Sequence, residues 1–145
     1  MPKPFRLAPA RDRYLAAIYS FEEDGKDTTT GSLAKTLEVT PASVSEALKF
    51  LESKKLVERK SWGKYVLSQR GRAVAMRMFH NHRVLETYFA SVLGLKEDVA
   101  CEEASKIDAV VGDELISRMC KALSWPSVCF HGRPIHHTVC RGDNR

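Results

Sequence analysis

The residues best suited to bind a metal ion all lie late in the chain. Every histidine and every cysteine follows residue 79. His82 and Glu86 are four residues apart, so on a helix they would share one face, with β-carbons about 6 Å apart. An imidazole and a carboxylate at that distance can bind one ion, and Cys101 could add a thiolate from a following helix. The same spacing also suits an exposed helical ion pair, and Cys101 alone is as typical of a buried small residue.

A second set of possible donors lies in the C-terminal tail. Two of them, Cys129 and His131, could complete the ligand set of the helical pair. The remaining donors could bind zinc or iron by themselves, although the spacing Cys-x-His followed by His-His-x-x-Cys matches no recognised zinc finger. The alternative is a flexible tail whose histidines are incidental. These remaining donors are His136, His137 and Cys140.

The positive charge lies at the other end of the chain. All of the formal net charge of +5 comes from residues 1–75, because acidic and basic residues balance in residues 76–145. A basic surface suits a polyanion such as DNA. No apolar run approaches the roughly 18 residues of a membrane span, and none follows the basic start of the chain as in a signal peptide. We therefore expect a cytoplasmic protein, in which cysteines stay reduced and serve as metal ligands, redox sensors or packing residues.

Residues 1–75 show the element order of a winged helix-turn-helix. The third helix of this region begins at Thr40-Pro41, a capping residue followed by proline at the first helical position. Trp62-Gly63 is typical of a hairpin turn, which would form the wing. Apolar periodicity and turn residues predict helices over residues 14–21, 33–37 and 41–51, and strands over residues 56–60 and 64–67. Three consecutive threonines at residues 28–30 are candidate caps of the second helix. The residues expected to point inward are Tyr14, Ala17, Ile18 and Phe21 on the first helix, and Val44, Ala47, Leu48 and Leu51 on the third.

The third helix carries the surface that we expect to read DNA. With its apolar stripe packed inward, short side chains face outward near its start and let a helix N-terminus approach DNA closely. Hydroxyls can bond to phosphates or base edges, a methyl group can contact a thymine methyl, and Glu46 can accept from a cytosine amine. The alternative is a solvated face on a domain that binds protein. The predicted DNA-binding residues, including flanking phosphate contacts, are Thr40, Ala42, Ser43, Ser45, Glu46, Lys35, Lys49, Arg59, Lys60 and Lys64.

Three helices are predicted after the hairpin. Ser68 can cap a long helix that runs towards Leu93, with Gly94 as its C-cap, and helices over residues 96–110 and 113–123 follow. Helices this short bury their apolar surface poorly alone, so we expect a homodimer. The residues of the last helix expected to point inward are Leu115, Ile116, Met119 and Leu123, with Cys120 packed beside them.

Six stretches of the chain carry motifs of a known family: residues 14–23, 33–45, 65–68, 82–86, 101–104 and 129–135. In their order and spacing they resemble the iron- and manganese-dependent repressors of the diphtheria toxin repressor and manganese transport regulator family, in its two-domain form. The resemblance implies a mostly α fold, with a winged helix-turn-helix over residues 1–75 and a helical metal-binding and dimerisation domain over residues 76–124. A tail over residues 125–145 would follow and could add metal ligands.

The resemblance also implies two neighbouring metal sites, of which this sequence keeps one. His82 and Glu86 are retained, and Cys101 stands where the family usually has a ligand histidine. The other site is largely dismantled, because non-ligating residues stand at three of its positions, Arg13, Ser105 and Ala109, and Asp108 replaces a glutamate. The predicted metal ligands are His82, Glu86, Cys101, Cys129, His131 and Asp108.

Residues and resemblance together predict a metal-dependent transcriptional repressor of metal-homeostasis genes. Thiolate donors shift the preference from Mn(II) towards softer ions, so we expect Fe(II) as the effector, with Mn(II) and Zn(II) as the alternatives. The partner would be double-stranded DNA, with a palindromic operator that matches the homodimer. A thiol redox sensor or a metal-independent DNA-binding regulator on the same scaffold is the competing hypothesis. No paired nucleophile and base, glycine-rich phosphate loop or His-Glu-x-x-His motif is present, so we expect no enzyme.

Overall fold

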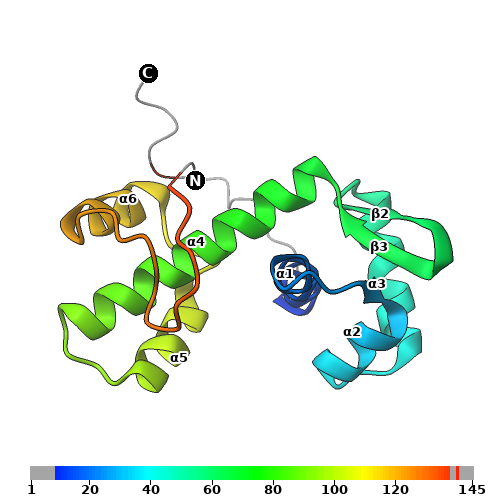
Figure 1. The fold of residues 1–145 in the computed structure, drawn as a ribbon, viewed down its shortest axis with the longest axis horizontal. Helices are drawn as coiled ribbons and strands as arrows, with labels where there is room; N and C mark the ends of the chain where they lie inside the picture. The colour runs from blue at the N-terminus through cyan, green and yellow to red at the C-terminus, as the bar shows by residue number, and fades with distance from the viewer. Residues whose placement is uncertain (1–8, 138–139, 141–145) are drawn as a thin grey trace. The chain divides into compact units, whose positions relative to one another are not determined.

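The computed structural model describes residues 9–137 and residue 140. The chain divides into two compact units after Ala75. The described residues are mostly helical, with six α-helices and one small sheet (Figure 1), which confirms the predicted fold class. Among these residues, no helix is both long and apolar enough to cross a bilayer.

The first unit is a three-helix domain with a wing. Its three strands form an antiparallel sheet in the order β1-β3-β2, in which Thr28 pairs with Tyr65 and Val57 pairs with Leu67. The sequence predicted β2 and β3 but not β1, because three consecutive threonines were interpreted only as helix caps. The elements are α1 (Pro9–Glu23), β1 (Thr28–Thr29), α2 (Thr30–Leu37), α3 (Pro41–Ser53), β2 (Val57–Arg59) and β3 (Lys64–Leu67).

Two threonine caps fix the helix-turn-helix. Thr29 and Ser32 form a capping box, in which each side chain accepts a hydrogen bond from the other residue's backbone N–H, at 3.1 and 2.8 Å. Thr40 caps α3 by accepting from the backbone N–H of Ser43 at 3.2 Å. The turn between α2 and α3 passes through Glu38 in the left-handed conformation. Each cap satisfies an otherwise unpaired helical N–H, so the start of α3 is well defined.

The core of this unit lies where the apolar stripes of its helices meet. Leu33 from α2 and the predicted α3 residues Val44, Ala47, Leu48 and Leu51 are buried. On α1, however, the buried face is displaced from the predicted one. Tyr14 and Ile18 are buried as expected, but their buried neighbours are Leu15 and Tyr19, whereas Ala17 and Phe21 are only half-buried.

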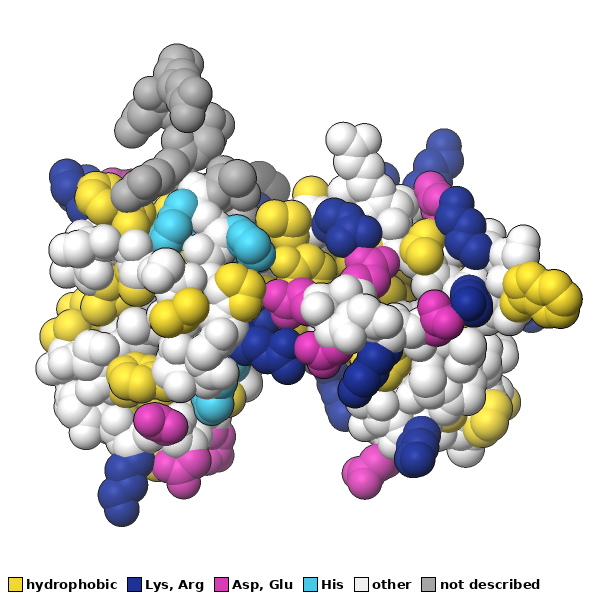
Figure 2. Space-filling view, viewed as in Figure 1, with side chains coloured by type: hydrophobic (Ala, Val, Ile, Leu, Met, Phe, Trp, Pro, Cys, Tyr) yellow, Lys and Arg dark blue, Asp and Glu magenta, His cyan; other side chains and the backbone are white. Residues whose placement is uncertain are grey.

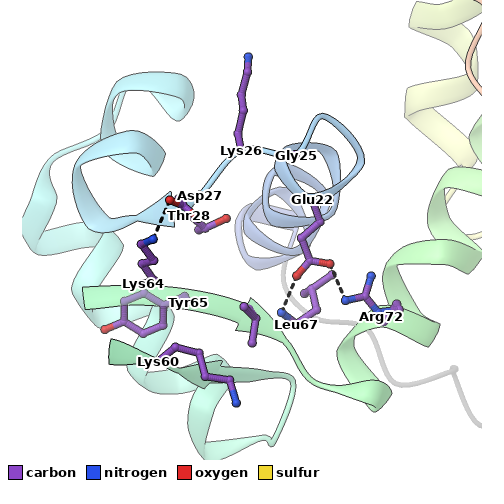
Figure 3. A pocket seen from close by; sticks show the side chains of 11 residues that line it. Glu22, Gly25, Lys26, Asp27, Thr28, Lys60, Lys64, Tyr65, Leu67 and Arg72 are labelled. Carbon is purple, nitrogen blue, oxygen red and sulfur yellow. Dashed lines mark hydrogen bonds and ion pairs between the residues drawn. The ribbon is translucent and has the colours of Figure 1, made fainter. Parts of the chain in front are cut away.

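Glu22 connects the end of α1 to the wing and to the long helix that follows the wing. One carboxylate oxygen accepts a hydrogen bond from the backbone N–H of Leu67 at 3.0 Å, and the other forms an ion pair with Arg72 at 2.6 Å. These contacts lie beside a polar pocket whose opposite wall carries the Lys64–Asp27 ion pair (Figure 3). The wing strand is thus held at its C-terminal end by a side chain of α1.

Gly71 allows the start of the following helix to touch the loop before β2. A Cβ built on Gly71 would lie 1.9 Å from the carbonyl oxygen of Leu56. Gly71→Ala is therefore expected to reduce the free energy of unfolding by about 1–3 kcal/mol or more, because the contact is with backbone that cannot rotate away. Urea unfolding measures the effect. Gly31→Ala is the matched control, since its Cβ would have only an ordinary contact at 3.9 Å; equal stabilities of the two variants would contradict the argument.

The second unit packs three helices and an ordered hairpin around one core. Helix α4 (Gln69–Ser91) spans the division between the units and is followed by α5 (Glu97–Ile107) and α6 (Asp113–Ala122). Ser68 caps α4 as predicted, by accepting from the N–H of Gly71 at 3.0 Å. The core residues are Val84, Leu85, Ala104, Ile116, Met119, Cys120, Cys129 and Ile135.

Three details of the second unit differ from the sequence prediction. Helix α5 ends at Ile107 rather than at residue 110, and α4 ends at Ser91 rather than near residue 93. Leu115 was predicted to point inward but is 55% exposed, because α6 buries the neighbouring face that contains Ile116, Met119 and Cys120. In the tail, Val128 and Pro134 form a β-bridge, which closes a hairpin over residues 127–135.

Candidate metal centre

Helix α4 places His82 and Glu86 on one face, one turn apart, as their spacing predicted. His82 Nε2 lies 3.6 Å from Glu86 Oε2. Glu86 is only 2% exposed, and among the described residues its Oε2 receives no hydrogen bond of normal geometry. Burying a carboxylate is unfavourable unless a cation or hydrogen-bond donors compensate its charge. A buried carboxylate oxygen that faces an imidazole is therefore a suitable metal ligand.

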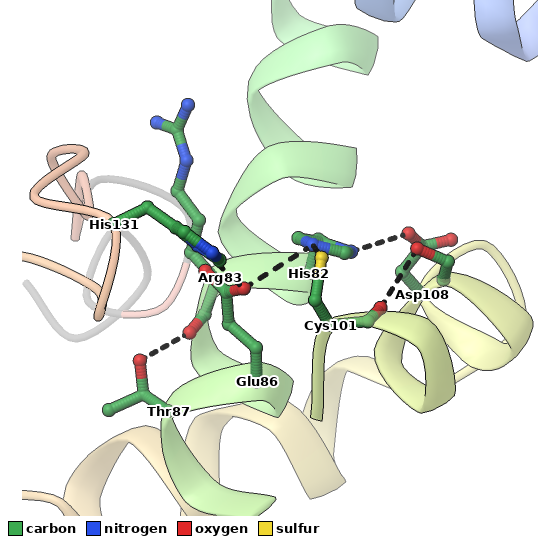
Figure 4. A network of polar contacts seen from close by, with 8 residues as sticks. His82, Arg83, Glu86, Thr87, Cys101, Asp108 and His131 are labelled. Atoms are coloured by element: carbon green, nitrogen blue, oxygen red, sulfur yellow. Dashed lines mark hydrogen bonds and ion pairs between the residues drawn. The ribbon is translucent and has the colours of Figure 1, made fainter. Parts of the chain in front are cut away.

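Helix α5 brings a sulfur donor to the same point. Cys101 Sγ lies 3.5 Å from His82 Nε2, and both face the carboxylate of Glu86 (Figure 4). The three ligand atoms lie within 4.8 Å of one another. The exposed ion pair that was the alternative for His82 and Glu86 does not describe this arrangement, since Glu86 is buried.

The tail hairpin supplies two more donors from the other side of Glu86. His131 Nδ1 lies 3.3 Å from Glu86 Oε2, and the ligand atoms of Glu86, Cys129 and His131 lie within 4.8 Å of one another. The hairpin is held by backbone hydrogen bonds, among them Cys129 N–H to the carbonyl of Arg133 at 2.9 Å. Glu86 thus belongs to both donor groups, and together they bring four other predicted ligands to its carboxylate.

Asp108, the sixth predicted ligand, lies elsewhere. Its Oδ2 is 3.1 Å from His82 Nδ1, the ring nitrogen that faces away from Glu86 and Cys101. Asn81 in turn donates a hydrogen bond from Nδ2 to the backbone carbonyl of Asp108 at 3.2 Å. A carboxylate in this position orients the imidazole and leaves Nε2 for the ion, so Asp108 suits an orienting role better than ligation.

Arg83 is a residue of this region that sequence reasoning missed. Although charged, it is only 5% exposed, and its Nη1 donates to the carbonyl of Pro134 at 2.8 Å. Its guanidinium also lies over the ring of Phe79. Arg83 therefore ties the tail hairpin to α4 beside the donor groups. An arginine next to His82 gives no sequence signal for this role, because its partner is a backbone carbonyl 51 residues away.

The predicted DNA-reading face is exposed in the first unit. Thr40, Ala42, Ser43, Ser45, Glu46 and Lys49 all face solvent around the N-terminal half of α3. Lys35, Arg59 and Lys60 are exposed, and Lys64 is half-buried. Lys60 and Lys64 pair with Glu58 and Asp27 at 2.9 and 2.8 Å. Figure 2 shows Lys and Arg side chains over the surface of this unit, whereas histidine appears only over the second.

Sequence reasoning treated Trp62 only as part of the turn of the wing. It is 93% exposed, in the left-handed conformation with φ 64°. A large aromatic side chain this exposed at the tip of a wing contributes little to the stability of the fold. Trp62 is therefore a further candidate contact for DNA.

Comparison with known proteins decides the family. A family model described as the iron dependent repressor N-terminal DNA binding domain matches residues 6–63, and one described as the iron dependent repressor metal binding and dimerisation domain matches residues 68–137. The chain belongs to the iron-dependent repressor family. The resemblance inferred from the motifs is thus confirmed.

Individual relatives and solved structures are similar to most of this chain. The diphtheria toxin repressor of Corynebacterium jeikeium is 30% identical over 89% of this chain and 54% of its own length, so the chain spans about half of that relative. A solved structure described as a manganese-dependent transcriptional repressor complex with manganese shows 31% identity and a TM-score of 0.77, over 86% of this chain and 57% of that one. A hypothetical protein from Sulfolobus solfataricus has 28% identity and a TM-score of 0.72, over 90% of this chain and 99% of its own.

Among the described residues, the positions of the second site that the family resemblance implied offer no comparable set of donors. Arg13 is an exposed cation on α1, which would repel a metal ion, and Ala109 has no donor atom. The hydroxyl of Ser105 donates to the carbonyl of Cys101 at 3.0 Å. The residues of this chain thus favour a single family site, centred on Glu86.

The protonation of this centre opposes metal binding at low pH. Burial lowers the pKa of His82, but hydrogen bonds to Asp108, Glu86 and Cys101 outweigh it and raise the pKa to about 10. Burial likewise raises the pKa of Glu86, but His82 and Cys129 outweigh it, so the pKa lies below its usual value. For the Cys129 thiol, burial and Glu86 both raise the pKa. An ion must therefore displace protons from His82 and Cys129, and its affinity falls as pH falls.

The raised pKa of His82 predicts a pH dependence for the metal-free protein. The pKa is about 10 in the folded state against 6.5 in an unperturbed histidine. The stabilisation from this group is fully present below about pH 6.5 and is lost as pH rises towards about 10. The stability difference between the chelator-treated protein and His82→Gln should therefore shrink across this range in urea titrations. A difference that stays constant would show that His82 is not protonated in the fold.

Proposed function

We propose that this protein is a cytoplasmic, metal-dependent DNA-binding regulator that acts as a homodimer and represses genes of metal homeostasis. The observation that carries the proposal is the convergence of donors from α4, α5 and the tail hairpin on the buried carboxylate of Glu86. Its membership of the iron-dependent repressor family supports both parts of the proposal, since the matched models are a DNA-binding domain and a metal-binding and dimerisation domain.

His82, Glu86, Cys101, Cys129 and His131 would hold the ion, with Asp108 fixing the ring of His82. This set combines imidazole, carboxylate and thiolate, which suits Fe(II) and Zn(II) better than Mn(II). We therefore propose Fe(II) as the physiological effector, with Zn(II) able to bind as well. The related solved structures include one described with Zn²⁺ and one with manganese, so the scaffold accepts both kinds of ion elsewhere.

Ligation would act on DNA binding through linkage. By joining α4 to α5 and to the tail hairpin, the ligands would restrict the motion of α4, the helix that also enters the first unit. In a homodimer this restriction would favour the arrangement of two winged domains that fits successive major grooves. An ion that prefers this arrangement by about 1–3 kcal/mol would raise DNA affinity about 5- to 150-fold. Exposed apolar residues of the second unit, such as Leu115, are available for the dimer contact.

On DNA, α3 would lie in the major groove of a palindromic operator. Ala42, Ser43, Ser45 and Glu46 would face base edges, with Thr40 at the helix start beside the phosphates. Lys35, Lys49, Arg59, Lys60 and Lys64 would contact phosphates, the last two after giving up their carboxylate partners. Trp62 would reach the neighbouring minor groove from the tip of the wing.

An anaerobic titration tests the proposal. Fe(II), Mn(II) and Zn(II) are added separately to chelator-treated protein, and binding to an operator selected from random duplexes is measured by fluorescence anisotropy at each step. The proposal expects tighter binding with metal and saturation with two ions per dimer at this centre. Equal affinity with and without every ion would overturn it, and a response to peroxide but not to chelators would favour the redox sensor.

A further inference from the structure

A second group of metal donors lies in the second unit, away from the centre at Glu86. The ligand atoms of His80, Cys120, His137 and Cys140 lie within 4.8 Å of one another. His80 lies on α4 and Cys120 on α6, whereas His137 and Cys140 lie in the tail after the hairpin. None of them belongs to the first centre. Side chains two positions apart on an α-helix point about 200° apart, so His80 and His82 lie on opposite faces of α4.

The distances already match those of a tetrahedral zinc site. Zn–S bonds of about 2.3 Å and Zn–N bonds of about 2.0–2.1 Å place two sulfurs about 3.8 Å apart, and a sulfur and a nitrogen about 3.5 Å apart. The sulfurs of Cys120 and Cys140 are 3.7 Å apart. His137 Nδ1 lies 3.3 Å from each of them. A disulfide would need about 2.05 Å, so the two cysteines are not bonded to each other.

The ring of His137 is fixed in the form that a metal ligand requires. Its Nε2 lies 2.8 Å from the carbonyl oxygen of Pro126. A carbonyl oxygen only accepts hydrogen bonds, so Nε2 carries the proton. The lone pair of Nδ1 is then available to a metal ion bound by the two sulfurs. A backbone carbonyl that orients a histidine through its other nitrogen is the usual arrangement around a ligated metal.

His80 provides the strongest independent indication. It is only 2% exposed, and neither of its ring nitrogens has a hydrogen-bond partner of normal geometry among the described residues. Its ring stands edge-on to that of His137, with centroids 6.1 Å apart. Buried polar atoms are nearly always satisfied, and an ion between His80, His137 and the two thiols would satisfy this imidazole.

We propose that His80, Cys120, His137 and Cys140 form a structural zinc site that fastens the tail, at His137 and Cys140, to α4 and α6. Four protein ligands of types His₂Cys₂ complete a tetrahedral shell and leave no open position, which is the pattern of structural rather than catalytic zinc. The site stands on its own residues and does not depend on the proposed function. Sequence reasoning considered His137 and Cys140 as zinc ligands but assigned Cys120 to packing and did not consider His80.

Cobalt(II) is the probe, because thiolate-bound tetrahedral Co(II) absorbs strongly in the visible range. The full chain carrying Cys101→Ser and Cys129→Ser has no thiolate left at the first centre, so any Co(II)–thiolate absorption must come from Cys120 and Cys140. We expect one equivalent of Co(II) to give this absorption in the reduced, chelator-treated protein, and one equivalent of zinc to displace it.

Adding Cys140→Ser to this background should abolish the absorption. It should also weaken zinc binding by more than about 10–100-fold, which is the loss expected for a residue that only hydrogen-bonds to a metal ligand. Cys140 is only half-buried, so this variant should fold. His137→Gln is the second variant and should have the same effect. Absorption that is absent from the background protein, or that survives both changes, would overturn the proposal. So would a Cys120–Cys140 disulfide, without bound zinc, in protein purified under reducing conditions.

Discussion

Glu86→Gln is expected to abolish the effect of metal on DNA binding. Glu86 is the one residue that both donor groups of the centre share, and glutamine keeps its shape while removing the charge and one acceptor oxygen. The wild-type protein should bind its operator about 5- to 150-fold more tightly with metal, as expected for a coupling of about 1–3 kcal/mol. For the variant, the affinities with and without Fe(II) should agree to within about 2-fold. Fluorescence anisotropy with chelator-treated protein measures both.

The control for this prediction is Glu114→Gln. Glu114 lies on α6 of the same unit, is exposed, and pairs with Arg118 at 2.9 Å. An exposed ion pair contributes little to stability, so this variant should keep the full metal response. Circular dichroism checks that both variants fold. A Glu86→Gln protein that responds to Fe(II) at the wild-type midpoint would show that the regulating ion binds elsewhere.

The secondary structure of the first unit could largely be predicted because its signals are local. Thr40-Pro41 starts α3, and the apolar spacing of Val44 to Leu51 identifies its buried face; the structure confirms both. The buried face of α1 differs from the predicted one because the residues from Tyr14 to Tyr19 are all apolar. Apolar spacing therefore does not distinguish one face of this helix from the adjacent face. The two residues of β1 were missed because a strand this short exists only through its partner, β3.

The centre was predictable only where its donors share a helix or the family pattern covers them. His82 and Glu86 are linked by their spacing, and Cys101, Cys129 and His131 by the resemblance. Asp108 illustrates the limit: sequence places it near the site, but only the structure shows that it contacts Nδ1 rather than joining the donors at Nε2. The four residues of the proposed zinc site are separated by up to 60 positions, and apolar periodicity assigned Cys120 to packing. The local spacing of residues in the sequence cannot show that such distant residues come together in the fold.

Lys49→Glu is expected to lower operator affinity on the order of 100-fold or more. Lys49 is exposed on α3, next to the residues proposed to face base edges. Replacing a phosphate contact with a carboxylate puts like charges together, which costs several kcal/mol, and each 1.4 kcal/mol is a factor of ten in Kd. Because each protomer of the dimer loses one phosphate contact, the slope of log K against log salt should also fall by about 1.8, which is about 0.9 for each contact. Anisotropy titrations at several salt concentrations give both quantities.

Lys121→Glu is the matched control, because it makes the same charge change on an exposed lysine of α6, in the unit that carries no predicted DNA contact. Net charge alone would weaken binding equally in both variants, whereas a specific phosphate contact weakens it mainly in Lys49→Glu. Metal affinity should be unchanged in either variant, since both lysines lie outside the donor groups. Equal losses of affinity and equal salt slopes for the two variants would mean that α3 does not face the duplex, and the DNA-reading face would then have to lie elsewhere in the first unit.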